Sequence, residues 1–482
     1  MKAIRIIEIA FLFAAALSDA NGQDFHRVYR DFVRTAREAH RSFSDSLNAE
    51  FARTISSNWE QFQMLEPESS AVSPQPYSPT VVGESDKSSG GALKASEIVD
   101  TVGTALYMGD NVSHSAFSSV SVRTVSFLFY GSVQEISVPA VYGSFHPSGI
   151  SESDVGEFWQ RLGREDFTRI LYECRYRRDN YGFNDWAVLE WVQALSCAIY
   201  PQNINSERII FEVFVLNQMG LMAKLARSDN RLECLFASLQ PVFARKYTII
   251  DTYRYYLTDA KAPVTSIYTY RPDFSGKPRP FDLRIKNPLV LGGEDSYGLM
   301  HFKSQVFGCE LEIPVNNALK SFYEGYPQTT VNVYAQSSPD SRFSDSLLAQ
   351  LGEKLAGLDE SAKINELLRF QHYDFPYKAD LDQFGYERQF FCEENFIYKA
   401  NDCEDRAVLF SFLVRRLTGR KVVLLEYDDH IATAVRFDEG CTGHYVKLED
   451  GRYFICDPTF IGATAGMCMP EYIEKRTRVY VL

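Results

Sequence analysis

The sequence predicts an α+β protein with more than one domain. Helical periodicity and strand-like runs follow one another in blocks, an order typical of α+β folds. The length of 482 residues exceeds what a single hydrophobic core usually organises. Hydrophobic residues make up 45% of the chain, which is enough to build cores for domains of ordinary size.

The first residues resemble a secretory signal. Lys2 and Arg5 precede a short apolar run, and small residues follow at positions 20–22. The apolar run is too short to span a bilayer. We therefore expect residues 1–22 to be a signal peptide and the protein to be exported, to a periplasm or to the extracellular space. A buried N-terminal helix is the alternative.

Residues 23–65 predict a long amphipathic helix or a helix pair. Large apolar residues recur at every fourth position and therefore share one helix face: Phe43, Leu47, Phe51, Ile55 and Trp59. That face would pack on the body of the protein or support self-association through residues 24–64. Residues 66–92 are rich in proline, serine and glycine, which predicts a flexible linker.

The remaining chain predicts two mixed regions. We assign residues 93–343 to a mixed α/β region and residues 344–482 to a separate C-terminal domain. The blocks that support this division are strand-like at 120–143 and 247–335, mostly helical at 152–245 and 344–371, and helix followed by three strands from 401 onward.

Charge and cysteine content exclude several classes of function. The formal net charge of −13 disfavours a nucleic-acid partner, and no later stretch predicts a membrane span in the mature chain. The nine cysteines include no Cys-x-x-Cys pair, so neither a zinc knuckle nor a small disulfide scaffold is indicated. We expect no cofactor and no metal, with a metal site of Cys403, Cys441 and His444 as a poorer option. A disulfide from Cys403 to Cys392 or Cys441 is not excluded by sequence.

The stretch NDCEDRAVLFSFLVRRLTG, residues 401–419, predicts an amphipathic helix with a cysteine in its first turn. Asp402 and Gly419 are residue types that cap the two ends of a helix. Cys403 would then lie where free backbone N–H groups and the helix dipole favour a thiolate. The two acids that follow Cys403 oppose this effect unless they pair with Arg406 or point into solvent.

A nucleophilic cysteine needs a histidine, and the following segments supply one. His430 opens the predicted strand HIATAVRF, and Asp457 closes the strand in GRYFICDPTF. Three antiparallel strands packed on one helix would bring Cys403, His430 and Asp457 together. In such a triad the carboxylate orients the imidazole and the imidazole activates the thiol. Each residue taken alone is more often structural than catalytic.

These segments resemble the transglutaminase-like (papain-like cysteine) superfamily. The resemblance is carried by NDCEDRAVLFSFLVRRLTG, DDHIATAVRF and RYFICDPTF. It implies a helix packed on antiparallel strands, with Cys403 as the nucleophile, His430 as the general base and acid, and Asp457 as the orienting carboxylate.

The resemblance extends upstream and covers about residues 344–470. In LLRFQHYDFPYKADLDQFGYE it implies that Gln371 stabilises the oxyanion, with the backbone N–H of Cys403 as a second donor. One departure is Asn401, where many bacterial members have glycine.

An earlier segment, about residues 150–260, looks like a degenerate copy of the same core. SERIIFEVFVLNQMG parallels EDRAVLFSFLVRRLTG, and a Gln193 lies where Gln371 lies in the later copy. The expected counterparts of the triad residues are Asn205 or Ser206 for the cysteine, Arg231 for the histidine and Asp251 for the aspartate. Arginine cannot accept a proton, so this copy would be catalytically inactive. Coincidence between two units of similar length is the alternative.

The sequence thus predicts an exported cysteine enzyme that acts on amide bonds through a thioester. Water as the acyl acceptor would make it a peptidase or amidase, and an amine would make it an acyltransferase. Proteins, peptides or cell-wall peptides are the expected substrates. The alternative is a non-catalytic binding or scaffold protein that retains the fold.

Overall fold

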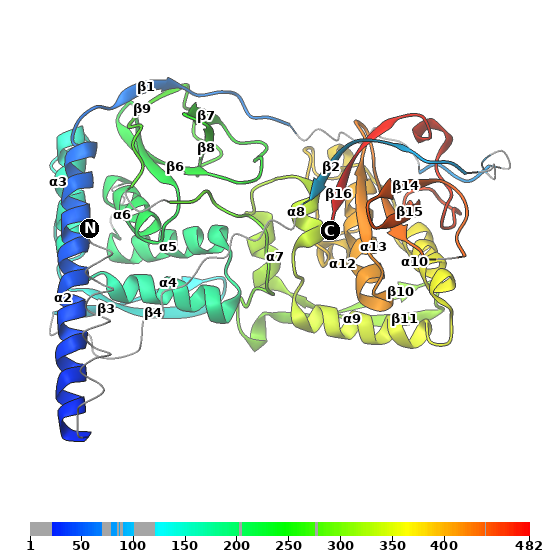
Figure 1. The fold of residues 1–482 in the computed structure, drawn as a ribbon, viewed down its shortest axis with the longest axis horizontal. Coiled ribbons are helices and arrows are strands. Elements are labelled where there is room, and N and C mark those ends of the chain that lie inside the picture. Colours follow the sequence, from blue (N-terminus) through cyan, green and yellow to red (C-terminus); the bar gives the residue numbers. More distant parts are fainter. Residues whose placement is uncertain are drawn as a thin grey trace.

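The computed structural model shows an α+β protein of two lobes that lie side by side, which confirms the predicted class (Figure 1). Helices and antiparallel strands occur in both lobes. The predicted signal peptide lies almost wholly outside the described part of the chain. The structure describes residues 22–69, 79–83, 86, 90–100, 121–201, 205–274, 278–438 and 440–482.

The N-terminal lobe packs helices on a six-stranded sheet and a hairpin. Its helices are α2 (Gly22–Ile55), α3 (Glu152–Arg164), α4 (Thr168–Tyr181), α5 (Asp185–Ile199) and α6 (Asn205–Gln218). The hairpin is β3 (Val122–Phe129) and β4 (Ser132–Pro139). The sheet strands are β1 (Glu60–Gln63), β5 (Ala223–Ser228), β6 (Arg231–Ala237), β7 (Tyr247–Ile250), β8 (Tyr253–Leu257) and β9 (Ser266–Thr269). Their spatial order is β1-β9-β5-β6-β8-β7.

The C-terminal lobe repeats this plan. Its hairpin is β10 (Tyr297–Ser304) and β11 (Cys309–Asn316), which follows the short helix η2 (Glu294–Ser296). Its helices are α7 (Asn317–Glu324), α8 (Val331–Gln336), α9 (Ser341–Lys354), α10 (Glu360–Asp374), α11 (Asp380–Gln383), α12 (Glu394–Ile397), α13 (Cys403–Thr418) and η3 (Pro470–Tyr472). Its sheet strands are β2 (Lys94–Asp100), β12 (Val422–Glu426), β13 (Ile431–Arg436), β14 (Tyr445–Leu448), β15 (Gly451–Ile455) and β16 (Arg476–Val481). Their order is β14-β15-β13-β12-β16-β2.

The two sheets match strand for strand. Read from β7 to β1, the first sheet has the same order as the second sheet read from β14 to β2. Each sheet follows a hairpin and a set of helices, and α6 and α13 occupy the same place before β5 and β12. One difference lies at the last strand, because β1 is antiparallel to β9 whereas β2 is parallel to β16. This correspondence supports an internal duplication.

The chain crosses between the lobes before it builds the body of the N-terminal lobe. Strand β1 pairs in the N-terminal lobe, β2 pairs with β16 in the C-terminal lobe, and β3 lies back in the N-terminal lobe (Figure 1). The described ends of the expected linker are docked: Ala244 N–H donates to the carbonyl of Glu68, and Val82 N–H donates to that of Ile461. The C-terminal lobe therefore includes β2 and begins again near β10, well before the predicted boundary at 344.

Two local predictions are wrong. Helix α2 ends at Ile55, earlier than expected, because Asn58 takes a positive φ of 65° and the Trp59 indole N–H donates to the carbonyl of Ile55. The run TTVNVYAQ was expected as a strand but forms α8. Its buried Val331 and Val333 pack in the core that α8 shares with α13, and such packing overrides the strand preference of β-branched residues.

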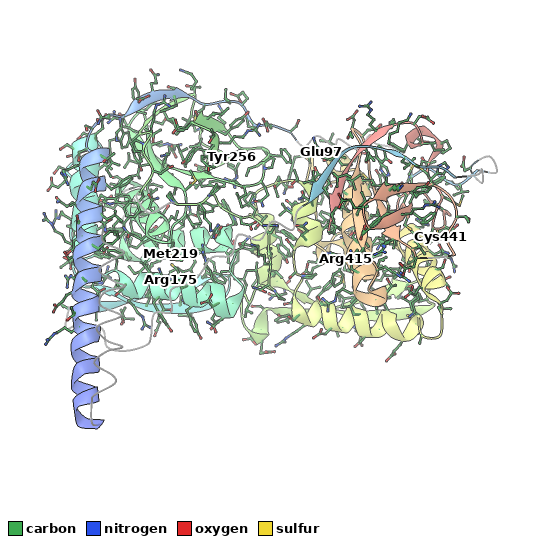
Figure 2. All side chains as sticks on the ribbon, in the orientation of Figure 1. Glu97, Arg175, Met219, Tyr256, Arg415 and Cys441 are labelled. Atoms are coloured by element: carbon green, nitrogen blue, oxygen red, sulfur yellow. The ribbon has the colours of Figure 1, made fainter. Side chains whose placement is uncertain are left out.

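Side chains fill the interior of both lobes and join them (Figure 2). Helix α7 lies at the junction, where the Phe322 ring is 5.7 Å from Tyr130 and the Tyr323 ring is 4.1 Å from Phe391. Helix α13 is the central helix of the C-terminal lobe and is buried from Cys403 to Val414. It packs on β12 and β13, so its first turn lies at the end of the sheet where β13 begins.

Candidate active site

Helix α13 has the ends that the sequence predicts. Asp402 is the N-cap, Cys403 is the first helical residue, and Gly419 ends the helix with a left-handed φ of 69°. Asp405 accepts from the backbone N–H groups of Phe390 and Asp402, at 2.9 and 3.3 Å. Cys403 is therefore held at the start of a well-capped helix, where first-turn N–H groups lack helical partners.

His430 and Asp457 form a hydrogen-bonded pair. Nε2 of His430 lies 2.8 Å from Oδ2 of Asp457, and both side chains are almost fully buried. The two residues meet because β13 and β15 are neighbours, with Ala434 opposite Ile455. The other oxygen, Oδ1, accepts from the backbone N–H of Thr459 at 2.8 Å. The carboxylate is thus fixed on one side by the backbone and on the other by the imidazole.

Cys403 places its sulfur at the start of β13, next to His430 of this pair. Its sulfur interacts with the backbone N–H of Ile431, the residue directly after His430. The thiol donates to Oε2 of Glu404 at 3.0 Å. The structure therefore brings the three predicted triad residues to one end of the sheet, with Glu404 as the thiol's hydrogen-bond partner.

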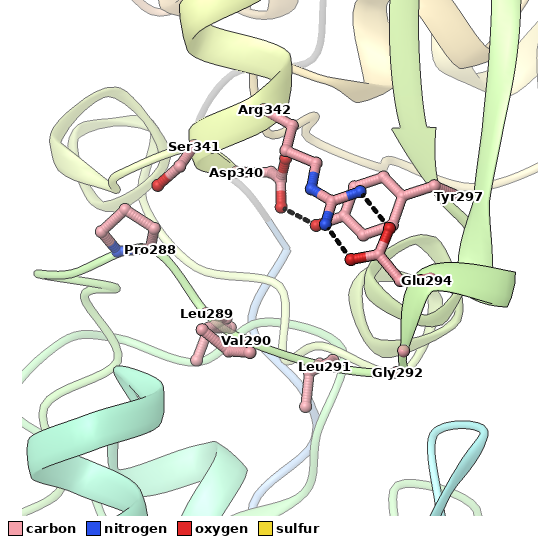
Figure 3. A pocket seen from close by; sticks show the side chains of 11 residues that line it. Pro288, Leu289, Val290, Leu291, Gly292, Glu294, Tyr297, Asp340, Ser341 and Arg342 are labelled. Atoms are coloured by element: carbon pink, nitrogen blue, oxygen red, sulfur yellow. Dashed lines mark hydrogen bonds and ion pairs between the residues drawn. The ribbon is translucent and has the colours of Figure 1, made fainter.

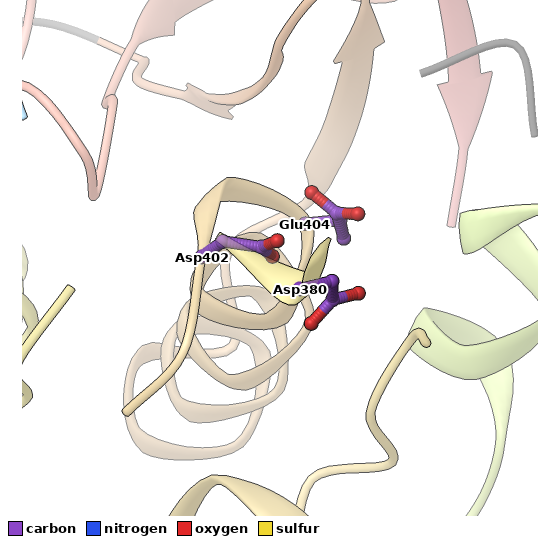
Figure 4. Close-up of side chains that lie close together, drawn as sticks. All are labelled: Asp380, Asp402 and Glu404. Carbon is purple, nitrogen blue, oxygen red and sulfur yellow. The ribbon is translucent and has the colours of Figure 1, made fainter. Parts of the chain in front are cut away.

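A cluster of buried acids surrounds the cysteine. Oxygens of Asp380, Asp402 and Glu404 lie within 4.8 Å of one another (Figure 4), and Asp405 follows on the same helix turn. Burial, and then Asp402, raises the pKa of Asp380 to about 9. Burial also raises the pKa of Asp402 to about 6 and that of Glu404 well above its usual range.

These carboxyls have no ion pair with a lysine, arginine or histidine among the described residues. Ionised carboxylates are costly to bury without compensation, so the cluster holds protons or a cation. Asp380, Asp402 and Glu404 are the residues that could hold a metal. An all-oxygen donor set suits Ca²⁺ or Mg²⁺ rather than zinc.

The cluster changes the electrostatics that the sequence predicted for Cys403. Burial, followed by Glu404 and Asp402, raises the pKa of the Cys403 thiol well above its usual range. Glu404 and Asp405 neither point into solvent nor pair with Arg406. Burial, Glu404 and Asp402 together outweigh the effect of the helix start, so the thiol is protonated in this conformation and needs a base to become a nucleophile.

Gln371 lies on the last turn of α10, which packs on α13. Its side chain is fully buried, and neither amide atom has a hydrogen-bond partner in the described part of the chain. A buried amide without partners is unusual in a folded protein. This state fits a group kept free for a substrate oxygen.

His372, the next residue, was missed by sequence reasoning. Its Nε2 donates to the carbonyl of Asp457 at 3.1 Å, and its Nδ1 accepts from the N–H of Gly462 at 3.3 Å. Burial lowers the pKa of His372 to about 4, so the ring is neutral and serves both bonds at once. His372 thus holds both ends of the loop that carries Asp457. Its position beside Gln371 was the only sequence signal.

The buried Arg406 side chain connects the segments that surround the site. Its guanidinium donates to Oδ1 of Asn401 at 2.9 Å and to the carbonyls of Phe375 and Pro458 at 2.6 and 3.3 Å. These contacts tie α13 to α10 and to the Asp457 loop. Asn401 supplies one of the acceptors.

Other sequence candidates do not join the site. All nine cysteines are free thiols, so Cys403 is not held in a disulfide. Cys441 lies at the outer end of the C-terminal lobe (Figure 2), and His444 accepts from the backbone N–H of Gly91. Within the described residues, the only group of three or more metal-binding side chains is the acidic one. A metal site of Cys403, Cys441 and His444 is therefore wrong.

The two cavities described here lie away from the triad. One, of about 270 Å³, lies beside the segment that joins the lobes, where Arg342 pairs with Glu294 and Tyr297 donates to Asp340 (Figure 3). The other, of about 410 Å³, is lined by Arg436 and other residues of the sheet's outer edge. Neither is lined by a triad residue.

No family model, curated protein or solved structure matches this chain. Among the described residues, no helix has the length and apolar character needed to cross a membrane. The functional interpretation therefore depends on the geometry of the site.

Proposed function

We propose that the protein is an exported, transglutaminase-like cysteine enzyme that acts on amide bonds. The observation that carries the proposal is the buried His430–Asp457 hydrogen bond at the point where the sulfur of Cys403 meets the start of β13. The papain-like arrangement of a helix packed on antiparallel strands is consistent with it. A fold without chemistry has no need to keep all three residues together.

The contacts assign a role to each residue. Asp457 holds Nε2 of His430 and leaves Nδ1 to take the proton of the Cys403 thiol. The thiolate then attacks a substrate carbonyl carbon, and the carbonyl electrons move to oxygen. Collapse of this intermediate expels the amine, which takes the proton from His430, and leaves a thioester on Cys403.

Gln371 and the backbone N–H of Cys403 are the proposed donors to the oxyanion. Water resolves the thioester in a peptidase or amidase, and a primary amine resolves it in an acyltransferase. Proteins, peptides and cell-wall peptides are the proposed substrates. His430 serves as the base for either acceptor.

A non-catalytic binding or scaffold protein is the second candidate, and one observation favours it. The thiol is buried, protonated and bonded to Glu404. If this were the only conformation, the three residues would be retained without catalytic activity. The proposed enzyme must therefore change conformation when it binds substrate.

The test compares the purified protein with Cys403→Ala on a pool of peptides, with and without a fluorescent primary amine. Cleaved or amine-labelled peptides that require Cys403 would support the enzyme. Cys197→Ala, which removes an exposed thiol, is the matched control and should keep full activity. Equal product from the wild type and Cys403→Ala would refute the proposal.

A further inference from the structure

The proposed nucleophile is closed off in this structure. Cys403 is 1% exposed and His430 is 5% exposed, and Gln371 has no exposed surface. A substrate carbonyl must reach the sulfur and the amide together. Some part of the surrounding structure must therefore move before any acyl transfer takes place.

Tyr472 covers the imidazole. Its ring centroid lies 5.0 Å from that of His430 and 4.6 Å from that of Tyr427. Burial, then Asp429, raises the pKa of the Tyr472 hydroxyl, and Cys403 makes a smaller contribution. Tyr472 is itself only 9% exposed. It therefore fills the space beside the imidazole, one of the two reacting groups.

Tyr472 belongs to a segment whose backbone is hydrogen-bonded to the sheet only at its ends. We call residues 467–475 the flap. The backbone hydrogen bonds recorded for the flap stay within residues 464–475. Before it, Gly466 is fixed by bonds to Ile455 and His444 and has a φ of 91°, which favours glycine. After it, β16 begins. Movement of the flap would separate Cys468 and Met469 from the core and Glu474 from Lys94 of β2, but it would break no backbone hydrogen bond of the sheet.

An exposed ion pair holds the flap down. Nζ of Lys475 lies 3.2 Å from both oxygens of Asp429 and 4.3 Å above the Tyr472 ring. Asp429 directly precedes His430, so this contact closes the flap over the histidine. Ion pairs at this exposure contribute little stability and are easily released.

The corresponding connection in the N-terminal lobe is too short to form such a flap. Its β8 and β9 are joined by residues 258–265, whereas β15 and β16 are joined by residues 456–475. The longer connection occurs in the lobe that keeps the cysteine and histidine. Tyr377 is not on the flap, and its ring lies 5.3 Å from the Arg406 guanidinium.

We propose that the flap is a gate, that Tyr472 is the residue a substrate must displace to reach Cys403, and that Asp429 and Lys475 hold the gate closed. This inference rests on the proposed function. The gate would admit an acyl group into the space that the Tyr472 ring now fills. Tyr472 would thereby restrict which substrates reach the sulfur.

The experiment measures the rate at which Cys403 is alkylated, by mass spectrometry, with iodoacetamide and with a bulky fluorescein iodoacetamide. Tyr472→Ala should accelerate labelling by the bulky reagent about tenfold or more, and labelling by iodoacetamide less. Lys475→Ala, a surface change that leaves the core intact, should accelerate bulky labelling about two- to fivefold. Tyr253→Ala, on the N-terminal lobe, is the control and should change neither rate.

Equal bulky labelling in the wild type, Tyr472→Ala and Lys475→Ala would overturn the gate. Peptide turnover by the wild type is measured in parallel, so that the two proposals fail separately. Turnover with unchanged labelling refutes the gate and retains the enzyme. Accelerated labelling without any turnover refutes the enzyme and retains the gate.

Discussion

The N-terminal and C-terminal lobes share a strand order but differ where the C-terminal lobe carries its histidine. Leu235 pairs with Leu257 as Ala434 pairs with Ile455, and these pairings superimpose Arg231 on His430. Arg231 was the expected counterpart. It pairs with Glu233 at 2.5 Å and is 42% exposed. The first lobe therefore has a solvated cation where the second has a buried base.

The same pairings correct the expected counterpart of Asp457. Asp259, not Asp251, follows β8 as Asp457 follows β15. Oδ1 of Asp259 accepts from the N–H of Lys261 at 2.9 Å, the same bond that Asp457 forms with Thr459. Asp251 lies in the turn between β7 and β8 and pairs with Arg271. The aspartate turn thus persists without a histidine to orient, which indicates that it stabilises the fold itself.

The helix starts differ too. Helix α6 begins at Asn205, and its buried Glu207 pairs with His146, whereas the buried acids around Cys403 have no such partner. Residues 202–204 lie outside the described part of the chain. The comparison teaches that the sheet and helix need neither the histidine nor the acidic cluster. The shared architecture therefore does not account for the presence of those features in the C-terminal lobe.

The largest effect is expected when His430 of the C-terminal lobe is replaced by arginine, the residue at the corresponding position of the N-terminal lobe. His430→Arg should lower peptide turnover about 10³-fold or more, because arginine cannot take the thiol proton. Turnover is measured under saturating substrate, and circular dichroism checks the fold. A variant with near-normal turnover would show that His430 is not the base.

Replacing Asp457 and Asp259 in turn distinguishes a role in orienting the His430 imidazole from a role in stabilising the fold. Asp457→Asn should lower turnover about 10²- to 10³-fold, because the imidazole loses the group that fixes its tautomer. Asp259→Asn should leave turnover unchanged and affect stability alone. The two variants are compared in the same turnover and unfolding assays. Equal losses would make the aspartate a structural residue in both lobes.

Glu404 is the acid that accepts the hydrogen bond of the thiol. Because the pKa of Glu404 is itself raised well above its usual range, Glu404→Gln removes a charge only at the pH where that carboxyl ionises, and there the pKa of Cys403 should fall. Alkylation of the thiol in that pH range should rise about tenfold for each unit of the fall. The rate is followed from pH 5 to pH 10 in the presence of EDTA. An unchanged profile would mean that burial alone sets the thiol's protonation.

The acidic cluster should make the C-terminal lobe more stable in mild acid. The pKa of Asp380 is raised to about 9, so the folded state keeps a proton that the unfolded chain loses near pH 4. Its stabilising contribution is full below pH 4 and is lost as the pH rises to 9. Between pH 5 and 8, the free energy of unfolding should fall about 4 kcal/mol more in the wild type than in Asp380→Asn, because the two states differ by one proton over this range.

This difference is measured by urea unfolding in EDTA. The lowered pKa of His372 acts in the opposite sense, with stability lost as the pH falls from 6.5 to 4, but it is common to both proteins. Adding Ca²⁺ at pH 8 then shows whether a cation replaces the protons. Identical pH dependence in the two proteins would show that Asp380 is not protonated in the fold.

The smallest effect is expected when Arg231 of the N-terminal lobe is replaced by histidine, the residue at the corresponding position of the C-terminal lobe. Arg231→His breaks an exposed ion pair, so the unfolding free energy should change by less than about 1 kcal/mol. No activity should appear in the N-terminal lobe of a Cys403→Ala background, because the lobe lacks a cysteine at its helix start. Turnover in that variant would show that the first lobe retains a hidden nucleophile.

Much of the site was predictable because its parts have local signals. Asp402 and Gly419 cap a helix by residue type, and His430 and Asp457 stand at the ends of apolar runs that alternate with turns. The roles of Asp380 and His372 could not be predicted in this way. They reach Cys403 and Asp457 only through the packing of α10, α11 and α13, which no short pattern specifies.

The sequence by itself determined the α+β class, the helix that presents Cys403 and the order of the three triad residues, because periodicity and capping act over a few residues. Only the tertiary structure decided that the cysteine is buried and protonated, that Tyr472 packs on His430, and that β2 joins the distant sheet. Burial and the approach of charges depend on contacts between segments far apart in the chain. Those contacts set the pKa of the thiol and the access to it, and through them the conditions under which the site can react.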